Sequence, residues 1–264
     1  MSLQIRYSKE FAKELGKIAV YLPGEKVEVG DVLKFDHGKT LLGKARPLGS
    51  FKKITSLKNL GVSYPEPAFS NTPNTYRFSS KNAVNVEAGV NAVADLGSED
   101  LPSGSGQVSM KFSSEGAIYF LGINCDSKVL DDLAALENEI NTNGKKMVWD
   151  DTFLVTSITI AKKALIAQSR TKSSELVIAG DVNGIETGSV AVKAGAKLQV
   201  KKQSGDIFVK DWSDDVTVFM DVMKFEREVF GKVRGYRGLE MGEPPEEDPR
   251  IMLRKVNIKE LLED

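Results

Sequence analysis

The sequence predicts an α+β fold built on an antiparallel sheet, and three observations lead to this prediction. Residues 149–166 are rich in β-branched and aromatic side chains and contain no glycine or proline, which is typical of a central strand. Residues 83–93 and 189–201 alternate apolar and polar side chains, as the strands of a half-exposed antiparallel sheet do. Two further segments carry apolar residues at helical spacing, so helices are expected beside the sheet.

Composition narrows the class of protein. The chain has 264 residues, of which 41% are hydrophobic, so one core can serve a single domain with a short appendage. The 36 Lys+Arg and 37 Asp+Glu residues give a net charge of −1, so no nucleic-acid partner is expected. Apolar runs stay far below the roughly 20 residues of a membrane-spanning helix, and the start does not resemble a signal peptide. A cytoplasmic protein is expected, in agreement with its single cysteine, Cys125.

The N-terminal part of the chain predicts a helix, a strand and a short second helix. A capping serine and apolar residues at helical spacing indicate a helix from Ser8 to Lys17. Residues 27–35 alternate as a half-buried strand does, and the turn-prone residues 36–38 should end it. Between Ser50 and Gly61, apolar residues spaced three apart predict a short helix that ends at the glycine.

The middle of the chain predicts a hairpin and a helix. Residues 108–112 alternate in the same way as residues 83–93 and should pair with them as an antiparallel strand. A weak repeat supports a shared strand unit, because Phe78-Ser-Ser-Lys-Asn-Ala-Val recurs as Phe112-Ser-Ser-Glu-Gly-Ala-Ile. Residues 127–140 predict an amphipathic helix with one apolar stripe and one acidic face. The stripe is Val129, Leu133, Leu136 and Ile140, and the acidic residues are Asp131, Asp132, Glu137 and Glu139.

The C-terminal part divides the chain into a body, a linker and a tail. Residues 1–230 form the predicted body, which closes with strands in residues 189–201, 207–209 and 216–225. Residues 231–249 are rich in glycine, arginine, acids and proline, so an extended linker is predicted there. Residues 250–264 form the tail, whose apolar side chains should dock on a protein surface. They are Ile251, Leu253, Val256, Ile258, Leu261 and Leu262.

No motif in the sequence predicts catalysis or metal binding. His37 is the only histidine, so a serine-type triad has no other base, and its turn position favours an exposed side chain. Cys125 has an acidic neighbour that would raise its pKa, so a structural role is expected. The acid pairs at 150–151 and 214–215 precede strands, where turn and capping roles are usual. Residues 104–106 lack the Lys-Ser/Thr of a phosphate loop. We therefore expect a protein that is not an enzyme and holds no cofactor or metal.

The alternating strands leave two interpretations open. A membrane-spanning strand directs one face to lipid and the other to water, and about ten alternating residues satisfy that requirement. A half-exposed soluble sheet has the same pattern, which alone favours the soluble interpretation.

Several segments together resemble the bacterial gasdermins. They are Gly30-Asp31-Val32-Leu33, the strand Gly116 to Ile123 that runs into the helix Val129 to Ile140, the segment Phe153 to Lys163 with the downstream Ser169, and the closing run Val190 to Phe225. These segments cover most of residues 8–230. The resemblance implies a twisted, mainly antiparallel central sheet with peripheral helices, like the N-terminal domain of gasdermins. It also implies an autoinhibited pore-forming effector, activated by proteolysis in the linker, that oligomerises in membranes and kills the cell as an antiphage response.

The resemblance assigns roles to particular residues. It implies membrane hairpins in residues 83–93 with 108–112, and in residues 154–166 with 190–200. The hairpin candidates are Val84, Val86, Val90, Val108, Met110, Phe112, Ile158, Ile160, Val190, Val192, Leu198 and Val200. The six apolar tail residues become inhibitory contacts, and Arg234, Arg237 and Arg250 become cleavage candidates. The implied partners are an activating protease, membrane lipid after activation and further copies of the chain in the pore.

The sequence departs from the family in two respects, and one other class of function stays open. Residues 1–231 hold 29 basic and 29 acidic residues, so the body without its tail has little general attraction to anionic lipid. Bacterial gasdermins carry an acylated cysteine close to the N-terminus, and no cysteine stands there in this chain. The alternative function is a soluble β-rich binding module whose tail docks on its own sheet or on a partner protein. A third possibility, an enzyme of an unrecognised type, is the least expected.

Overall fold

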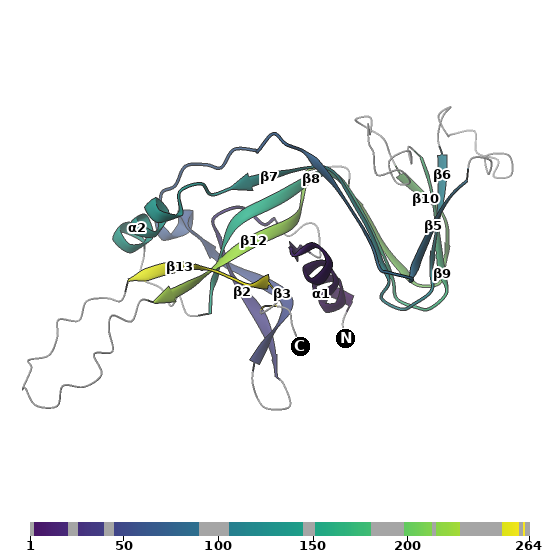
Figure 1. The fold of residues 1–264 in the computed structure, drawn as a ribbon, viewed down its shortest axis with the longest axis horizontal. Helices are drawn as coiled ribbons and strands as arrows, with labels where there is room; N and C mark the ends of the chain where they lie inside the picture. The colour runs from purple at the N-terminus through teal and green to yellow at the C-terminus, as the bar shows by residue number, and fades with distance from the viewer. Residues whose placement is uncertain are drawn as a thin grey trace, which may run out of the picture.

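The computed structural model describes residues 3–20, 26–39, 45–89, 106–144, 151–180, 198–212, 215–227, 250–258 and 261. Within this part of the chain, two antiparallel sheets dominate, accompanied by two α-helices, α1 (Leu3–Leu15) and α2 (Leu133–Asn143), and one 3₁₀ helix, η1 (Lys58–Leu60). Figure 1 shows the small sheet at one end of the molecule, with α2 and the C-terminal strand towards the other. The predicted α+β class with a mainly antiparallel sheet is confirmed.

The large sheet is organised around one strand. It contains nine strands in the described part of the chain, namely β1 (Ile18–Ala19), β2 (Asp31–Lys39), β3 (Ala45–Ser56), β4 (Asn74–Ser79), β7 (Ile118–Val129), β8 (Phe153–Ser169), β11 (Ile207–Trp212), β12 (Val216–Arg227) and β13 (Ile251–Lys255). β8 pairs with β2, β7, β11 and β12. Almost every side chain of β8 is buried, which explains why apolar residues predominate in its sequence and confirms the predicted central strand.

The small sheet contains four strands in the described residues. They are β5 (Val84–Gly89), β6 (Gly106–Phe112), β9 (Ser174–Gly180) and β10 (Leu198–Ser204), in the spatial order β10-β9-β6-β5. The predicted pairing of residues 83–93 with 108–112 is confirmed within this range, because Val84 lies opposite Phe112 and Val86 opposite Met110.

Three local predictions are wrong. The predicted helix at residues 50–61 is mostly the edge strand β3, because pairing with β2 outweighs a short helical spacing, and only η1 and its left-handed cap Gly61 remain helical. His37 lies inside β2, opposite Pro47, where the register shifts, and does not end that strand. α1 begins at Leu3, and Ser8, the expected cap, is buried within the helix.

The helix predicted at residues 127–140 is present but displaced. α2 begins after Asp132, whose carboxylate accepts a hydrogen bond from the Ala135 N–H at 2.9 Å. Val129 belongs to β7 and is exposed. Leu136 and Ile140 are buried, as the apolar stripe predicts.

Three buried clusters hold the described elements together. The inter-sheet core joins Val108, Met110, Phe112, Leu176 and Ile178 of the small sheet to Tyr119, Leu121, Leu165, Ala167 and Ile207 of the large sheet. The helix core lies beneath α1 and contains Tyr7, Phe11, Phe78, Ile118, Phe120, Ile166 and Phe219. The tail core includes Leu33, Phe35, Leu136, Ile140, Phe153, Leu154, Ile251, Leu253 and Leu261. No helix among the described residues has the length and apolar character needed to cross a membrane.

Candidate functional site

The two sheets are continuous with each other. Four neighbouring strands of the large sheet, in the order β4-β7-β8-β11, join four neighbours in the small sheet, in the matching order β5-β6-β9-β10. The chain therefore forms two long antiparallel hairpins side by side, β4 to β7 and β8 to β11, here called the first and second hairpins. Both bend sharply where they pass between the sheets (Figure 1). We call this bend the hinge line, which consists of residues 80–83, 113–117, 170–173 and 205–206.

Each of the four crossings of the hinge line contains a residue with a positive φ angle. They are Asn82 at 56°, Gly116 at 76°, Ser173 at 58° and Gly205 at 80°. A left-handed residue breaks the pleat of a strand and redirects the chain, and outside glycine it is uncommon. Asn82 and Gly116 occupy equivalent positions in the short sequence repeat, so that repeat marks two crossings of the hinge line.

The small sheet has an apolar inner face. Val108, Met110 and Phe112 alternate along β6 and are all buried in the inter-sheet core. Leu176 and Ile178 of β9 share this face and are equally buried. Val84 and Val86 of β5 are half-buried at its margin. The inner face is covered only because the hairpins bend back over the large sheet.

The outer face of the small sheet is charged. Glu87 of β5 pairs with Lys111 of β6 at 3.0 Å, and Glu175 of β9 pairs with Lys202 of β10 at 2.9 Å. Lys202 lowers the pKa of Glu175, chiefly through its hydrogen bond, and Glu87 raises the pKa of Lys111 in the same way. The small sheet is therefore amphipathic, with cross-strand ion pairs on one side and apolar side chains on the other.

The strand pairing in the second hairpin differs from the predicted pairing of residues 154–166 with residues 190–200. Val200 lies opposite Ile178 of β9, whereas residues 154–166 of β8 pair with β2, β7, β11 and β12. The reason is the crossing at residues 170–173, which ends β8 before the small sheet begins. Ile158 and Ile160 consequently lie in the large sheet, against the tail core. Val200 is half exposed, Leu198 lies opposite Gly180, and Val90, Val190 and Val192 lie outside the described residues.

The C-terminal tail docks on the body of the same chain. β13 pairs with β12 from Met223 to Arg227, with Leu253 opposite Phe225. Ile251, Leu253 and Leu261 are buried in the tail core, while Val256 and Ile258 pack at its margin. The described residues of the tail therefore pack against the body, and an inhibitory role for them stays a prediction. Leu262, Arg234 and Arg237 lie outside the described residues.

Polar side chains of α2 hold the other edge of the tail strand. The Asn141 side chain donates from Nδ2 to the Ile251 carbonyl at 2.8 Å and accepts from the Ile251 N–H at 2.7 Å. Glu137 accepts from the Leu253 N–H at 2.8 Å, and Arg250 donates to Asn138 at 3.2 Å. Glu137 was expected to face away from the protein, so its contact with the tail is a correction. The contacts of Asn141 and Glu137 are made to the backbone of an extended segment, and β13 thus has hydrogen-bond partners on both edges.

Comparison with known proteins concerns the fold. No family model matches the sequence, and no curated protein sequence matches it. The solved structures that are similar to this one include two gasdermin structures. The cryo-EM structure of the gasdermin A3 membrane pore shares 8% identity at a TM-score of 0.36, covering 90% of this chain and 98% of the other. A bacterial gasdermin from Bradyrhizobium tropiciagri shares 12% identity at a TM-score of 0.33, covering 83% of this chain and 86% of the other.

The residues weighed as candidates for catalysis or metal binding have structural roles where the structure describes their side chains. Burial raises the pKa of the Cys125 thiol to about 12, so this side chain is not a nucleophile at neutral pH. Asp151 has a positive φ of 57°, which fits the turn expected before β8, and Asp215 pairs with Lys162 at 2.8 Å. Among the described residues, no group of three or more His, Cys, Asp or Glu side chains is placed to bind a metal ion. The side chain of His37 lies outside the described part of the structure.

Proposed function

We propose that this chain is a pore-forming protein held inactive by its tail, and that the two hairpins are the segments that enter the membrane. The observation that carries the proposal is the bent, two-faced double hairpin. Its inner face is apolar and its outer face is charged, which is the arrangement that a strand between lipid and water requires.

Straightening of the hinge line would convert the hairpins into membrane segments. Each strand would then continue from the large sheet into the small sheet, for example from Asn74 to Gly89, and exceed the roughly 9–11 residues that span a bilayer. The inner face would exchange its contacts with the large sheet for lipid, whereas the ion pairs of the outer face would stay in water. Where several copies lie side by side, the edge strands of one copy would pair with the edge strands of the next.

The docked tail is the proposed inhibitor. It completes the tail core and occupies the edge of β12, so its release would expose apolar side chains and unpaired backbone groups at the same time. We infer that a protease cuts the linker or its border, with Arg234, Arg237 and Arg250 as candidates. The protein would rest in the cytoplasm, oligomerise in the membrane after cleavage and permeabilise the cell, in keeping with a role in antiphage defence.

Cleavage of the linker is expected to start dye release from vesicles. The full chain, with the recognition sequence of a specific protease inserted in residues 231–249, is mixed with dye-loaded vesicles and then cut. We expect the release rate to rise at least about tenfold on cleavage, because release of the tail opens the edge of β12. A chain without the inserted sequence, treated with the same protease, serves as the control. If the cut and uncut chains are equally silent on vesicles of several lipid compositions, the pore proposal is wrong and the binding-module alternative takes its place.

Asn141→Ala is expected to loosen the tail without cleavage. The substitution leaves the N–H and C=O of Ile251 without their side-chain partner, which costs about 1–3 kcal/mol. Hydrogen exchange of residues 251–255 in the uncut chain measures this directly, and roughly tenfold faster exchange is expected. Asn143→Ala, which removes an exposed amide from the same helix, should leave the exchange unchanged. Equal exchange in both variants would show that α2 does not hold the tail.

A further inference from the structure

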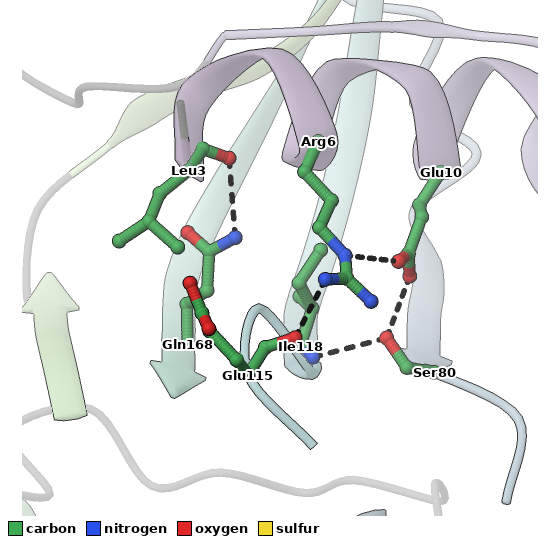
Figure 2. A network of polar contacts seen from close by, with 7 residues as sticks. All are labelled: Leu3, Arg6, Glu10, Ser80, Glu115, Ile118 and Gln168. Atoms are coloured by element: carbon green, nitrogen blue, oxygen red, sulfur yellow. Dashed lines mark hydrogen bonds and ion pairs between the residues drawn. The ribbon is translucent and has the colours of Figure 1, made fainter. Parts of the chain in front are cut away.

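Helix α1 contacts two of the four crossings of the hinge line and the strand that leads into a third (Figure 2). Arg6 donates from Nη1 to the Glu115 carbonyl at 2.6 Å, next to the left-handed Gly116. Glu10 accepts a hydrogen bond from the Ser80 hydroxyl at 2.6 Å, at the end of β4. Near the end of β8, before the crossing at residues 170–173, Gln168 donates to the Leu3 carbonyl at 3.1 Å. One helix therefore reaches both arms of the first hairpin and one arm of the second.

The contacts of Arg6 and Glu10 form one connected network, and the Gln168 bond is separate from it. Arg6 donates from Nε to Glu10 at 3.3 Å, which links the contact at Glu115 to the contact at Ser80. The Ser80 hydroxyl also accepts from the Ile118 N–H at 3.0 Å, where β7 begins. Backbone groups on both sides of the bend are thus satisfied through α1 or through Ser80, which α1 holds in place. Charge-assisted bonds of this kind are stronger than neutral ones.

The close approach of α1 depends on a glycine at the crossing. A Cβ atom at Gly116 would stand 2.6 Å from Cδ of Arg6, so the guanidinium group lies where any other side chain would begin. The positive φ of 76° at Gly116 sets the direction of the bend at the same residue. Arg6 therefore packs directly on the residue that redirects the chain.

The apolar side of α1 packs on one face of β7, and the inter-sheet core covers the other face of the same strand. Along β7, Ile118 and Phe120 point into the helix core, where they meet Phe11, and Tyr119 and Leu121 point into the inter-sheet core. The small sheet and α1 thus cover the two faces of one strand immediately beside the hinge line. A hinge line that straightens must change the backbone at Ser80 and at residues 115–118, which are the groups that the network holds.

We propose that α1 is a latch that holds the hinge line bent through the Arg6, Glu10 and Ser80 network, and that it is a second restraint besides the tail. The latch rests on the proposed function, because only a chain whose hairpins straighten has to release it. The network bonds involve Arg6, Glu10, Ser80, Glu115 and Ile118, and the separate bond from α1 to β8 involves Gln168. None of these residues contributes to the tail core. Either restraint can therefore be weakened by substitution while the contacts of the other are left in place.

Hydrogen exchange of the uncut full chain tests the latch in solution, without any membrane. In Arg6→Ala and Glu10→Gln, exchange of residues 106–117 and 174–180 is expected to be roughly tenfold faster than in the parent chain, since a charge-assisted bond is lost. Ser80→Ala, which removes only a hydroxyl group, should change the same segments in the same direction. Lys13→Ala alters an exposed residue of the same helix and should match the parent chain. Residues of β12 should exchange as before in all four variants.

Two results would overturn the latch. One is parent-like exchange of the small sheet in Arg6→Ala, Glu10→Gln and Ser80→Ala. The other is equal acceleration in β12 and in the small sheet, which would mean that α1 supports the whole fold and not the hinge line. Dye release after linker cleavage, measured in parallel, should be several-fold faster in the latch variants. If the cleaved parent chain is silent, the pore proposal fails, and the exchange data still decide whether α1 holds the bend.

Discussion

Phe11→Ala is expected to lower the free energy of unfolding by about 3–5 kcal/mol, because it removes a fully buried ring from the helix core. The Phe11 ring lies 4.4 Å from Tyr7, 4.7 Å from Phe78, 5.1 Å from Phe120 and 5.7 Å from Phe219, measured between ring centroids. These partners belong to four different elements, so no single neighbour can move in to fill the cavity. Since a domain of this kind has about 5–15 kcal/mol of stability in total, the variant should be close to unfolding.

Urea unfolding followed by far-ultraviolet circular dichroism measures the loss. Lys13→Ala lies on the exposed side of the same helix and should change the free energy of unfolding by less than about 0.5 kcal/mol. A loss below about 1 kcal/mol in Phe11→Ala would show that α1 is packed loosely, and it would remove the apolar support from the proposed latch.

The central strand was predictable from the sequence because its burial leaves a direct signal. β8 has neighbours along both edges and is covered on both faces, so nearly all its side chains are apolar or small. The first hairpin was predictable for a related reason. Its two small-sheet strands each bury one face, and that gives a clean alternation in residues 84–89 and 108–112.

The sequence does not predict the strand pairing of the second hairpin, because the bend between β8 and β9 consists of small polar residues. The Ser169 hydroxyl donates a hydrogen bond to the Ser174 hydroxyl at 2.9 Å, and the Thr171 and Ser174 hydroxyl groups are hydrogen-bonded at 3.0 Å. Such a cluster has the composition of an ordinary surface turn. Nothing in it indicates that the strand continues into a second sheet, so residues 154–166 were assigned the partner that belongs to β9.

The contacts at the hinge line and the contacts between α2 and the tail join residues that are far apart in the sequence. The contact from Arg6 to Glu115 joins residues 109 positions apart, and that from Asn141 to Ile251 joins residues 110 apart. The predicted helices, residues 8–17 and 127–140, include Glu10 but neither Arg6 nor Asn141. Helical periodicity also does not say that a polar side chain of a helix meets another segment. The short repeat at Phe78 and Phe112 was the available signal for the hinge line, since its fifth residue is left-handed in both copies.

Val86→Lys is expected to abolish dye release by the cleaved chain, whereas Asn85→Lys is expected to preserve it. The two residues are neighbours in β5 and point to opposite faces of the small sheet. In the pore, the inner face with Val86 would meet lipid, where a lysine near the middle of the bilayer costs about 2–4 kcal/mol in each copy. The outer face with Asn85 would meet water, and a lysine there adds a charge beside Glu87, which Asn85 already contacts at 2.7 Å.

The position of Val86 makes this comparison informative. It is half-buried at the margin of the inter-sheet core, so the resting fold should accept a long side chain whose charge reaches solvent. We expect release by Val86→Lys to fall at least tenfold and release by Asn85→Lys to stay within about twofold of the parent, with similar thermal unfolding of both uncut chains. Parent-like release by Val86→Lys would show that the inner face does not meet lipid. Equal loss in both variants would show that the first hairpin tolerates no added charge on either face, and the assignment of its two faces would then be wrong.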